Sequence, residues 1–197
     1  MKVITEETRA EIEVKKSRFI AIAIPCDRME DIKKEVQKVR EENPGANHVV
    51  HAAVIGPKGT LFSSSDDKEP KNTAGRPALD VVKGSGITNI LVLIVRYFGG
   101  TLLGTGGLVK AYSDSAKEVL KKVKTEELIE RKEFSLSLSY ENYNLVKRVM
   151  ENYDVKDAEE HFETDIRISG KVDAAKYEDF LKEMENIGQG RILIRRV

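Results

Sequence analysis

The sequence predicts an α+β protein built from two domains. Short apolar runs typical of strands alternate with segments in which apolar residues recur every three or four positions, as in amphipathic helices. The segment 121–132 (KKVKTEELIERK) is almost entirely charged and either extends a helix or forms a linker. After it the pattern restarts as a βαββαβ series. These observations divide the 197 residues into domains at 1–132 and 133–197.

The first domain is expected to contain both strands and helices. The expected strands are 9–15, 19–24, 48–55, 59–63 and 89–96, and the expected helices are 28–42, 77–84 and 106–123. The segment 89–96 (NILVLIVR) is continuously apolar, which predicts a strand buried on both faces. The helix at 28–42 should end at Asn43-Pro44-Gly45, because proline and glycine do not continue a helix. Residues 63–76 are polar and aperiodic, which predicts a loop.

The second domain follows the order βαββαβ. Its strands are expected at 134–140, 155–162, 164–172 and 190–197, and its helices at 142–152 and 174–185. This order is the ferredoxin-like pattern. Arg191 and Arg195 are four residues apart on the last expected strand, so they should share one face of the sheet.

Composition limits the classes of function. Lys and Arg number 33, as do Asp and Glu, and this balance argues against a strongly basic nucleic-acid tail but allows a local basic site. The single cysteine, Cys26, excludes an intrachain disulfide framework and is expected to be a buried thiol. The N-terminus has no apolar signal segment, and the longest strongly apolar run, Ile90–Val95, is too short to span a membrane. We expect a cytoplasmic protein without a membrane partner.

A glycine-rich segment, 99–107, lies between the expected buried strand and the helix after it. Glycine permits positive φ and close approach of a ligand to backbone N–H groups, and a helix start attracts anions. The segment is either a site for phosphate or a nucleic-acid backbone, flanked by Arg96 and Lys110, or a tight turn that needs glycine for packing. It matches no standard phosphate motif, because Thr105 stands where a P-loop needs lysine and Val109 where the dinucleotide motif needs glycine.

An acidic segment precedes it. Asp66, Asp67 and Glu69 could bind a divalent metal or act as acid and base. The alternative is a solvated loop in which Thr73 caps the short helix that follows, and the local sequence favours this alternative. The three histidines (48, 51 and 161) have no metal-binding spacing. We therefore expect no metal, no cofactor and no catalytic residue.

The two segments together form a longer signature. The first runs Asp66-Asp67-Lys68-Glu69-Pro70 and then Thr73-Ala74-Gly75-Arg76-Pro77, and the second runs from Arg96-Tyr97-Phe98-Gly99-Gly100 to Tyr112-Ser113. This signature resembles that of the IMPACT family, in particular its bacterial YigZ-like two-domain branch. The family usually has Gly, Ser and Gly where this chain has Lys68, Lys71 and Asn72.

The resemblance implies a fold and a class of function. It implies that residues 1–132 are similar to ribosomal protein S5 domain 2 and residues 133–197 to domain V of elongation factor G. Both likenesses point to RNA or the ribosome, and eukaryotic members of the family regulate translation through a protein partner. The resemblance also marks, as family-motif loop residues, Asp66, Asp67, Glu69, Pro70, Thr73, Ala74, Gly75, Tyr97, Phe98, Tyr112 and Ser113.

The expected function is therefore that of a non-catalytic, RNA- or ribosome-associated regulator of translation. The residues expected to contact RNA or phosphate are Arg96, Gly99, Gly100, Gly104, Thr105, Gly106, Gly107, Lys110, Lys68, Lys71, Arg76, Arg191 and Arg195. Two alternatives stay open. One is a small-molecule phosphotransferase-like enzyme whose glycine-rich loop holds phosphates, and the other is a protein–protein interaction module. The RNA target, the partner and the oligomeric state are left open.

Overall fold

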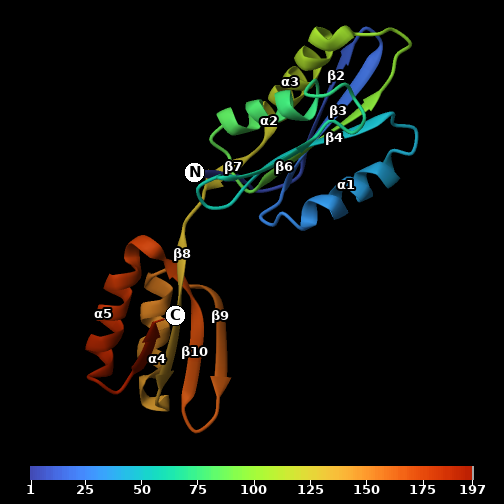
Figure 1. The fold of residues 1–197 in the computed structure, drawn as a ribbon. Helices are drawn as coiled ribbons and strands as arrows, with labels where there is room; N and C mark the ends of the chain where they lie inside the picture. The colour runs from blue at the N-terminus through green and yellow to red at the C-terminus, as the bar shows by residue number, and fades with distance from the viewer. Residues whose placement is uncertain (197) are drawn as a thin grey trace. The chain divides into compact units, whose positions relative to one another are not determined.

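The chain folds into two compact units, Met1–Leu128 and Ile129–Val197 (Figure 1). The computed structural model describes residues 1–196, with side chains through residue 195. The division lies four residues before the boundary at 132 that the sequence suggested. The charged segment is not only a linker, because it contains a short strand, β7 (Thr125–Glu127), and the beginning of the first strand of the second unit.

The first unit is built on a five-stranded antiparallel sheet in the order β2-β3-β6-β4-β5. Its strands are β2 (Thr8–Val14), β3 (Ser17–Pro25), β4 (His48–Ile55), β5 (Leu61–Ser65) and β6 (Ile90–Tyr97). Helices α2 (Gly75–Gly84) and α3 (Gly104–Lys122) pack on one face of this sheet, and α1 (Asp31–Glu42) packs on the other.

The central strand β6 is buried on both faces, as its apolar run predicts. Ile90, Val92 and Ile94 belong to the core under α2 and α3. Leu91, Leu93 and Val95 belong to the core under α1, together with the buried thiol of Cys26. Burial also raises the pKa of the Cys26 thiol, as expected for a structural cysteine.

Several element boundaries differ from the sequence-based expectation. Both α2 and α3 begin two residues earlier than expected, at Gly75 and Gly104. Pro77 fits inside the first turn of α2, because the first N–H groups of a helix have no acceptor within it. A two-stranded ribbon of β1 (Lys2–Ile4) with β7 was not predicted at all. Each strand has only three residues, too few for a periodic signal.

The second unit has the predicted βαββαβ order. Its elements are β8 (Arg131–Leu138), α4 (Tyr143–Asn152), β9 (Lys156–Phe162), β10 (Ile166–Asp173), α5 (Tyr177–Gly188) and β11 (Leu193–Arg196). The four strands form one sheet in the order β11-β8-β10-β9. Both helices pack on the same face of it, so the other face is not covered by a helix of this unit. None of the described helices is both long and apolar enough to cross a membrane.

Candidate functional site

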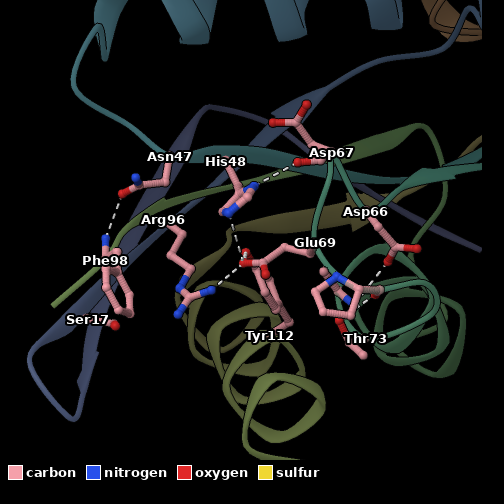
Figure 2. A network of polar contacts seen from close by, with 12 residues as sticks. Ser17, Asn47, His48, Asp66, Asp67, Glu69, Thr73, Arg96, Phe98 and Tyr112 are labelled. Carbon is pink, nitrogen blue, oxygen red and sulfur yellow. Dashed lines mark hydrogen bonds and ion pairs between the residues drawn. The ribbon is translucent and has the colours of Figure 1, made fainter. Parts of the chain in front are cut away.

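A buried carboxylate, Glu69, connects three elements of the first unit (Figure 2). Its Oε1 accepts a hydrogen bond from Arg96 Nη1 on β6 at 2.6 Å and another from the Tyr112 hydroxyl on α3 at 2.8 Å. His48 Nε2, at the start of β4, lies 3.7 Å from the same oxygen. A buried carboxylate is tolerated only when it is paired in this way. The interpretation of the acidic segment as a solvated loop is therefore wrong for Glu69.

The environment of Tyr112 keeps its hydroxyl protonated. Burial, together with the charge and the hydrogen bond of Glu69, raises the pKa of Tyr112 far above its ordinary value of 10.0. The phenol is therefore a permanent donor to Glu69 rather than a titrating group. Arg96 and Tyr112 both donate to the same oxygen of the buried carboxylate.

Asp66 caps helix α2, although it lies eight residues before Ala74, the N-cap residue of that helix. Its carboxylate accepts hydrogen bonds from the backbone N–H groups of Asn72, Ala74 and Gly75 at 2.8, 3.0 and 2.8 Å. The prediction that Thr73 caps the helix is wrong. Its hydroxyl donates instead to the Pro70 carbonyl at 2.6 Å, and the N-cap residue is Ala74, whose side chain has no oxygen.

Asp67 ties the loop to the other face of the sheet. Its Oδ2 accepts hydrogen bonds from the Val49 N–H at 2.6 Å and from Arg40 Nη2 at 2.8 Å. Burial alone would raise the pKa of Asp67, but these two donors together hold it below its ordinary value. The three carboxylates thus serve three separate structural contacts. Within residues 1–196, no three His, Cys, Asp or Glu side chains gather as a metal site.

Two of the chain's departures from the family signature lie at left-handed backbone positions. Lys68 has a φ of 68° and Asn72 a φ of 62°. Glycine adopts such angles without steric cost, which explains why the family usually has glycine at both places. Asparagine tolerates the left-handed region better than lysine does. The loop therefore adopts these angles without glycine, at a conformational cost that is larger at Lys68 than at Asn72.

The glycines of the segment 99–107 have different roles. A Cβ on Gly99 would lie 2.0 Å from the Lys16 carbonyl carbon, so Gly99 is required for packing against the turn between β2 and β3. Gly100 and Gly104 have φ values of 84° and 73° and allow the chain to turn into α3. A Cβ on Gly106 would meet nothing within 4 Å. The packing interpretation therefore explains Gly99, but not the open start of α3.

A cavity of about 460 Å³ opens at the start of α3. It is lined by Asn47, His48, Glu69, Pro70, Arg96, Phe98, Leu102, Leu103, Gly104, Thr105 and Leu108. No side chain caps α3 at its N-cap residue, Leu103. The first N–H groups of a helix have no intrahelical acceptor, and here they lie at a cavity wall. The cavity combines one apolar wall with several polar donors, which is the usual composition of a ligand site.

Arg96 lines this cavity and carries one unsatisfied buried donor. Its guanidinium is buried, yet Nε has no hydrogen-bond partner among the described residues. The neighbouring Phe98 is held by its backbone N–H, which donates to Asn47 Oδ1 at 2.8 Å. The Arg96 guanidinium lies 5.7 Å from the centre of the Phe98 ring. Strand β6 and the residues before β4 therefore fix both the charged and the aromatic part of the cavity.

The structure brings only part of the predicted binding residues together. Arg96, Gly104 and Thr105 line the cavity, and Gly106 and Gly107 continue the first turn of α3. The remaining predicted cations of the first unit (Lys68, Lys71, Arg76 and Lys110) are exposed and do not line it. Arg76 pairs with Asp80 at 3.0 Å, and Lys110 with Asp114 at 2.6 Å.

The expectation for the last strand needs correction. Arg191 lies before β11, which begins at Leu193, so the argument that it shares a strand face with Arg195 is wrong. Gly190 has a φ of 80° and continues the turn after α5, which delays the strand. Arg195 does lie on β11, opposite Ser135 of β8.

Sequence reasoning missed the apolar wall of the cavity. Leu102, Leu103 and Leu108 line it, together with His48, the first residue of β4, and Asn47 just before it. The leucines lie within the signature segment 96–113, but their residue type gave no indication of a ligand site. Asn47 and His48 are far from that segment in sequence and meet it only because β4 pairs with β6, where His48 lies opposite Arg96.

Comparison with known proteins tests the family. Residues 15–120 match the model of the Impact N-terminal domain. The chain belongs to the IMPACT family. An IMPACT family member from Haemophilus influenzae is 37% identical over 187 residues, which cover 94% of this chain and 91% of the relative. IMPACT family member YigZ from Escherichia coli is 34% identical over 182 residues, with coverage of 91% and 89%. The resemblance to the bacterial YigZ-like branch is confirmed.

A solved structure resembles this chain over its whole length. A protein described as "Crystal structure of an hypothetical protein" aligns with 100% of this chain and 96% of its own. The sequence identity is 32% and the TM-score is 0.78. The two-unit mixed α and β architecture is therefore shared with an experimentally solved protein.

Proposed function

We propose that this IMPACT family protein is a non-catalytic, RNA-associated cytoplasmic protein that acts in translation control. The observation that carries the proposal is the cavity at the uncapped start of α3, with the buried Arg96 in its wall. Helix starts and arginine side chains both bind phosphate well. An RNA backbone supplies such phosphates, and its bases supply apolar faces for Phe98 and Leu102.

The proposed fold relationships agree with an RNA partner. We infer that the first unit is similar to ribosomal protein S5 domain 2 and the second to ferredoxin-like domains such as domain V of elongation factor G. In the second unit, Arg167 and Arg195 lie opposite Ser137 and Ser135 of β8, on the sheet face that α4 and α5 do not cover. Both arginines are exposed, and this face is a second surface for RNA.

The zero net charge limits how strongly this protein can attract RNA. Because the net charge is zero, general attraction to polyanions is weak, and binding must depend on a few local contacts. For single-stranded RNA, a plot of log affinity against log salt concentration has a slope of about −0.7 for each phosphate that the protein contacts. We expect a slope that corresponds to about two or three phosphates.

Ribosome co-sedimentation, with and without nuclease, tests the proposed function. The full chain should sediment with ribosomes at low salt, and nuclease treatment should release it. Thr105→Asp puts a carboxylate at the anion site, and because acidic side chains favour helix starts the fold should be kept. Thr60→Asp makes the same charge change in the exposed turn after the far end of β4 and is the matched control.

Three results would decide against the proposal or part of it. If the two variants sediment with ribosomes equally well, the cavity is not part of the RNA site. The absence of the wild-type chain from the ribosome pellet, with no binding to structured RNA at low salt, would contradict RNA association. Nuclease-insensitive capture dominated by one protein would favour the alternative of a protein–protein interaction module.

One observation favours a second candidate, a small-molecule phosphotransferase-like enzyme. His48 Nδ1 donates to the Asp67 carbonyl at 2.7 Å, so a neutral ring keeps Nε2 without a proton on the side of Glu69. An imidazole fixed in this way is suited to act as a base. Binding of ATP with Mg²⁺ should then raise the stability of the chain by about 2.7 kcal/mol at a hundred times its Kd. Measured phosphate release would separate this candidate from simple nucleotide binding.

A further inference from the structure

We propose that the cavity at the start of α3 receives one unpaired nucleotide of an RNA, with its phosphate at the helix and its base on the apolar wall. This inference rests on the proposed RNA association and specifies which part of an RNA the protein recognises. Two features of the cavity lining carry it.

The first feature is the phosphate end. The backbone N–H groups of the first turn of α3 are not capped, and Gly104 and Gly106 leave the approach to them open, because a Cβ there would meet nothing within 4 Å. Arg96 adds a buried donor, Nε, that has no acceptor among the described residues. An unpaired buried donor is uncommon in native proteins. Arg96, Gly104 and Thr105 line the same cavity, so a phosphate there would lie near both the helix start and the guanidinium charge.

The negative charge of Glu69 does not prevent an anion from binding here. Its Oε1 accepts hydrogen bonds from both Arg96 and Tyr112, and its side chain is almost completely buried. The ion pair is therefore internally neutral, and Arg96 is held in place by it. The helix start supplies the favourable potential for the phosphate.

The second feature is the base end. Phe98 is 45% exposed and Leu102 is 83% exposed, although both are large apolar residues that line the cavity. Proteins stack unpaired bases on aromatic and apolar side chains of this kind. The volume of about 460 Å³ lies within the range of small-ligand sites. A paired base is held inside its helix and cannot reach the wall, so the site selects unpaired nucleotides.

Binding of short oligonucleotides to the full chain tests this inference. The probes are a fluorescein-labelled ten-nucleotide single-stranded RNA, the same sequence in a duplex, and the competitors adenosine 5′-monophosphate, adenosine and inorganic phosphate. The single strand should bind at least fivefold more tightly than the duplex. Adenosine 5′-monophosphate should compete better than either adenosine or phosphate, because only it occupies both ends of the cavity.

Matched substitutions locate the base end. Phe98→Ala should weaken single-strand binding about fivefold or more. Phe62→Ala should leave it unchanged, although Phe62 is also a half-exposed phenylalanine with a cation over its ring, Lys83 at 4.1 Å. If Phe98→Ala disturbs the fold, the second pair decides. Leu102→Ser should weaken binding and Leu61→Ser should not, and both leucines are exposed.

The outcomes separate this inference from the proposed function. Equal affinity for single strand and duplex, or unchanged binding by both Phe98→Ala and Leu102→Ser, would overturn the unpaired-nucleotide site while RNA association stands. If phosphate competes as well as adenosine 5′-monophosphate, the apolar wall does not bind a base. Binding of the mononucleotide without any binding of RNA or ribosomes would contradict the proposed function and show a site for free nucleotides instead.

Discussion

Arg96 Nη1 lies 2.6 Å from Glu69 Oε1, and the two side chains are only 6% and 3% exposed. The pair joins the loop before α2 to the central strand of the sheet, and Tyr112 brings α3 to the same oxygen. Because β6 is paired on both sides by β3 and β4, the backbone that carries Arg96 is held firmly in the sheet. The ion pair therefore fixes the back wall of the cavity at the start of α3.

Removing one member of this pair should be costly. Glu69→Ala leaves the Arg96 charge buried without compensation, and we expect a loss of about 3–5 kcal/mol in the unfolding free energy of the first unit. Hydrogen exchange of the slowest β6 amides measures this free energy.

The matched control for Glu69→Ala is Glu11→Ala, which breaks the pair with Arg18. These side chains are 48% and 50% exposed, so the expected loss is below about 1 kcal/mol. Similar losses for the two variants would show that the Glu69 pair has no special structural role.

The two kinds of glycine in the segment 99–107 should respond in opposite directions to alanine. Gly99→Ala places a methyl group against the Lys16 backbone and should destabilise the first unit by about 1–3 kcal/mol or more. Gly106→Ala meets no atom within 4 Å and lies in α3, where alanine is preferred over glycine by up to about 1 kcal/mol. Thermal unfolding of the two variants checks this, and destabilisation by Gly106→Ala would contradict it.

Asp66 should stabilise α2 through its contact with the helix start. Asp66→Ala removes the acceptor of three backbone N–H groups, and we expect a loss of about 0.5–2 kcal/mol. Amide exchange at Ala74 and Gly75 should accelerate. Asp80→Ala, which removes a carboxylate from the exposed pair with Arg76 within the same helix, should leave these amides unchanged.

Acid should weaken the contact made by Asp67. Its pKa is lowered in the folded chain from an ordinary value of 3.8, so the unfolded chain binds the proton first as pH falls. The contribution to stability is present above about pH 4 and is lost as pH falls through the folded pKa. Asp67→Asn should be less stable than wild type at pH 7, and the difference should shrink at pH 3. A difference independent of pH would exclude this linkage.

Periodic features of the fold were predictable from the sequence. The apolar run of β6 predicted a strand buried on both faces, and the alternation from residue 134 onward predicted the βαββαβ order of the second unit. These elements have enough residues for their period to be visible. The β1–β7 ribbon has only three residues in each strand and depends on pairing across 120 residues, so local sequence could not indicate it.

The site was less predictable, because its contacts are non-local. Glu69 was interpreted as part of a solvated loop, since its partner Arg96 is 27 positions away and lies on a strand. The glycine pattern predicted a helix start in this region, although two residues too late. It did not predict the apolar wall, because nothing in the local sequence distinguishes Leu102 from other leucines. The glycine pattern predicted a helix start that could attract anions, and only the fold places Phe98 and Leu102 beside that helix start.

Chemical shifts of the backbone amides and of the arginine Nε–H groups, followed during titration with a single-stranded RNA, locate the binding surface. We predict that the largest changes occur at residues 104–107 and at the Arg96 Nε–H, with smaller changes at Phe98 and Leu102. The titration should use the full chain at low salt, so that both units can contribute. Saturable binding with changes confined to other surfaces, and none at the start of α3, would contradict an RNA site at this cavity.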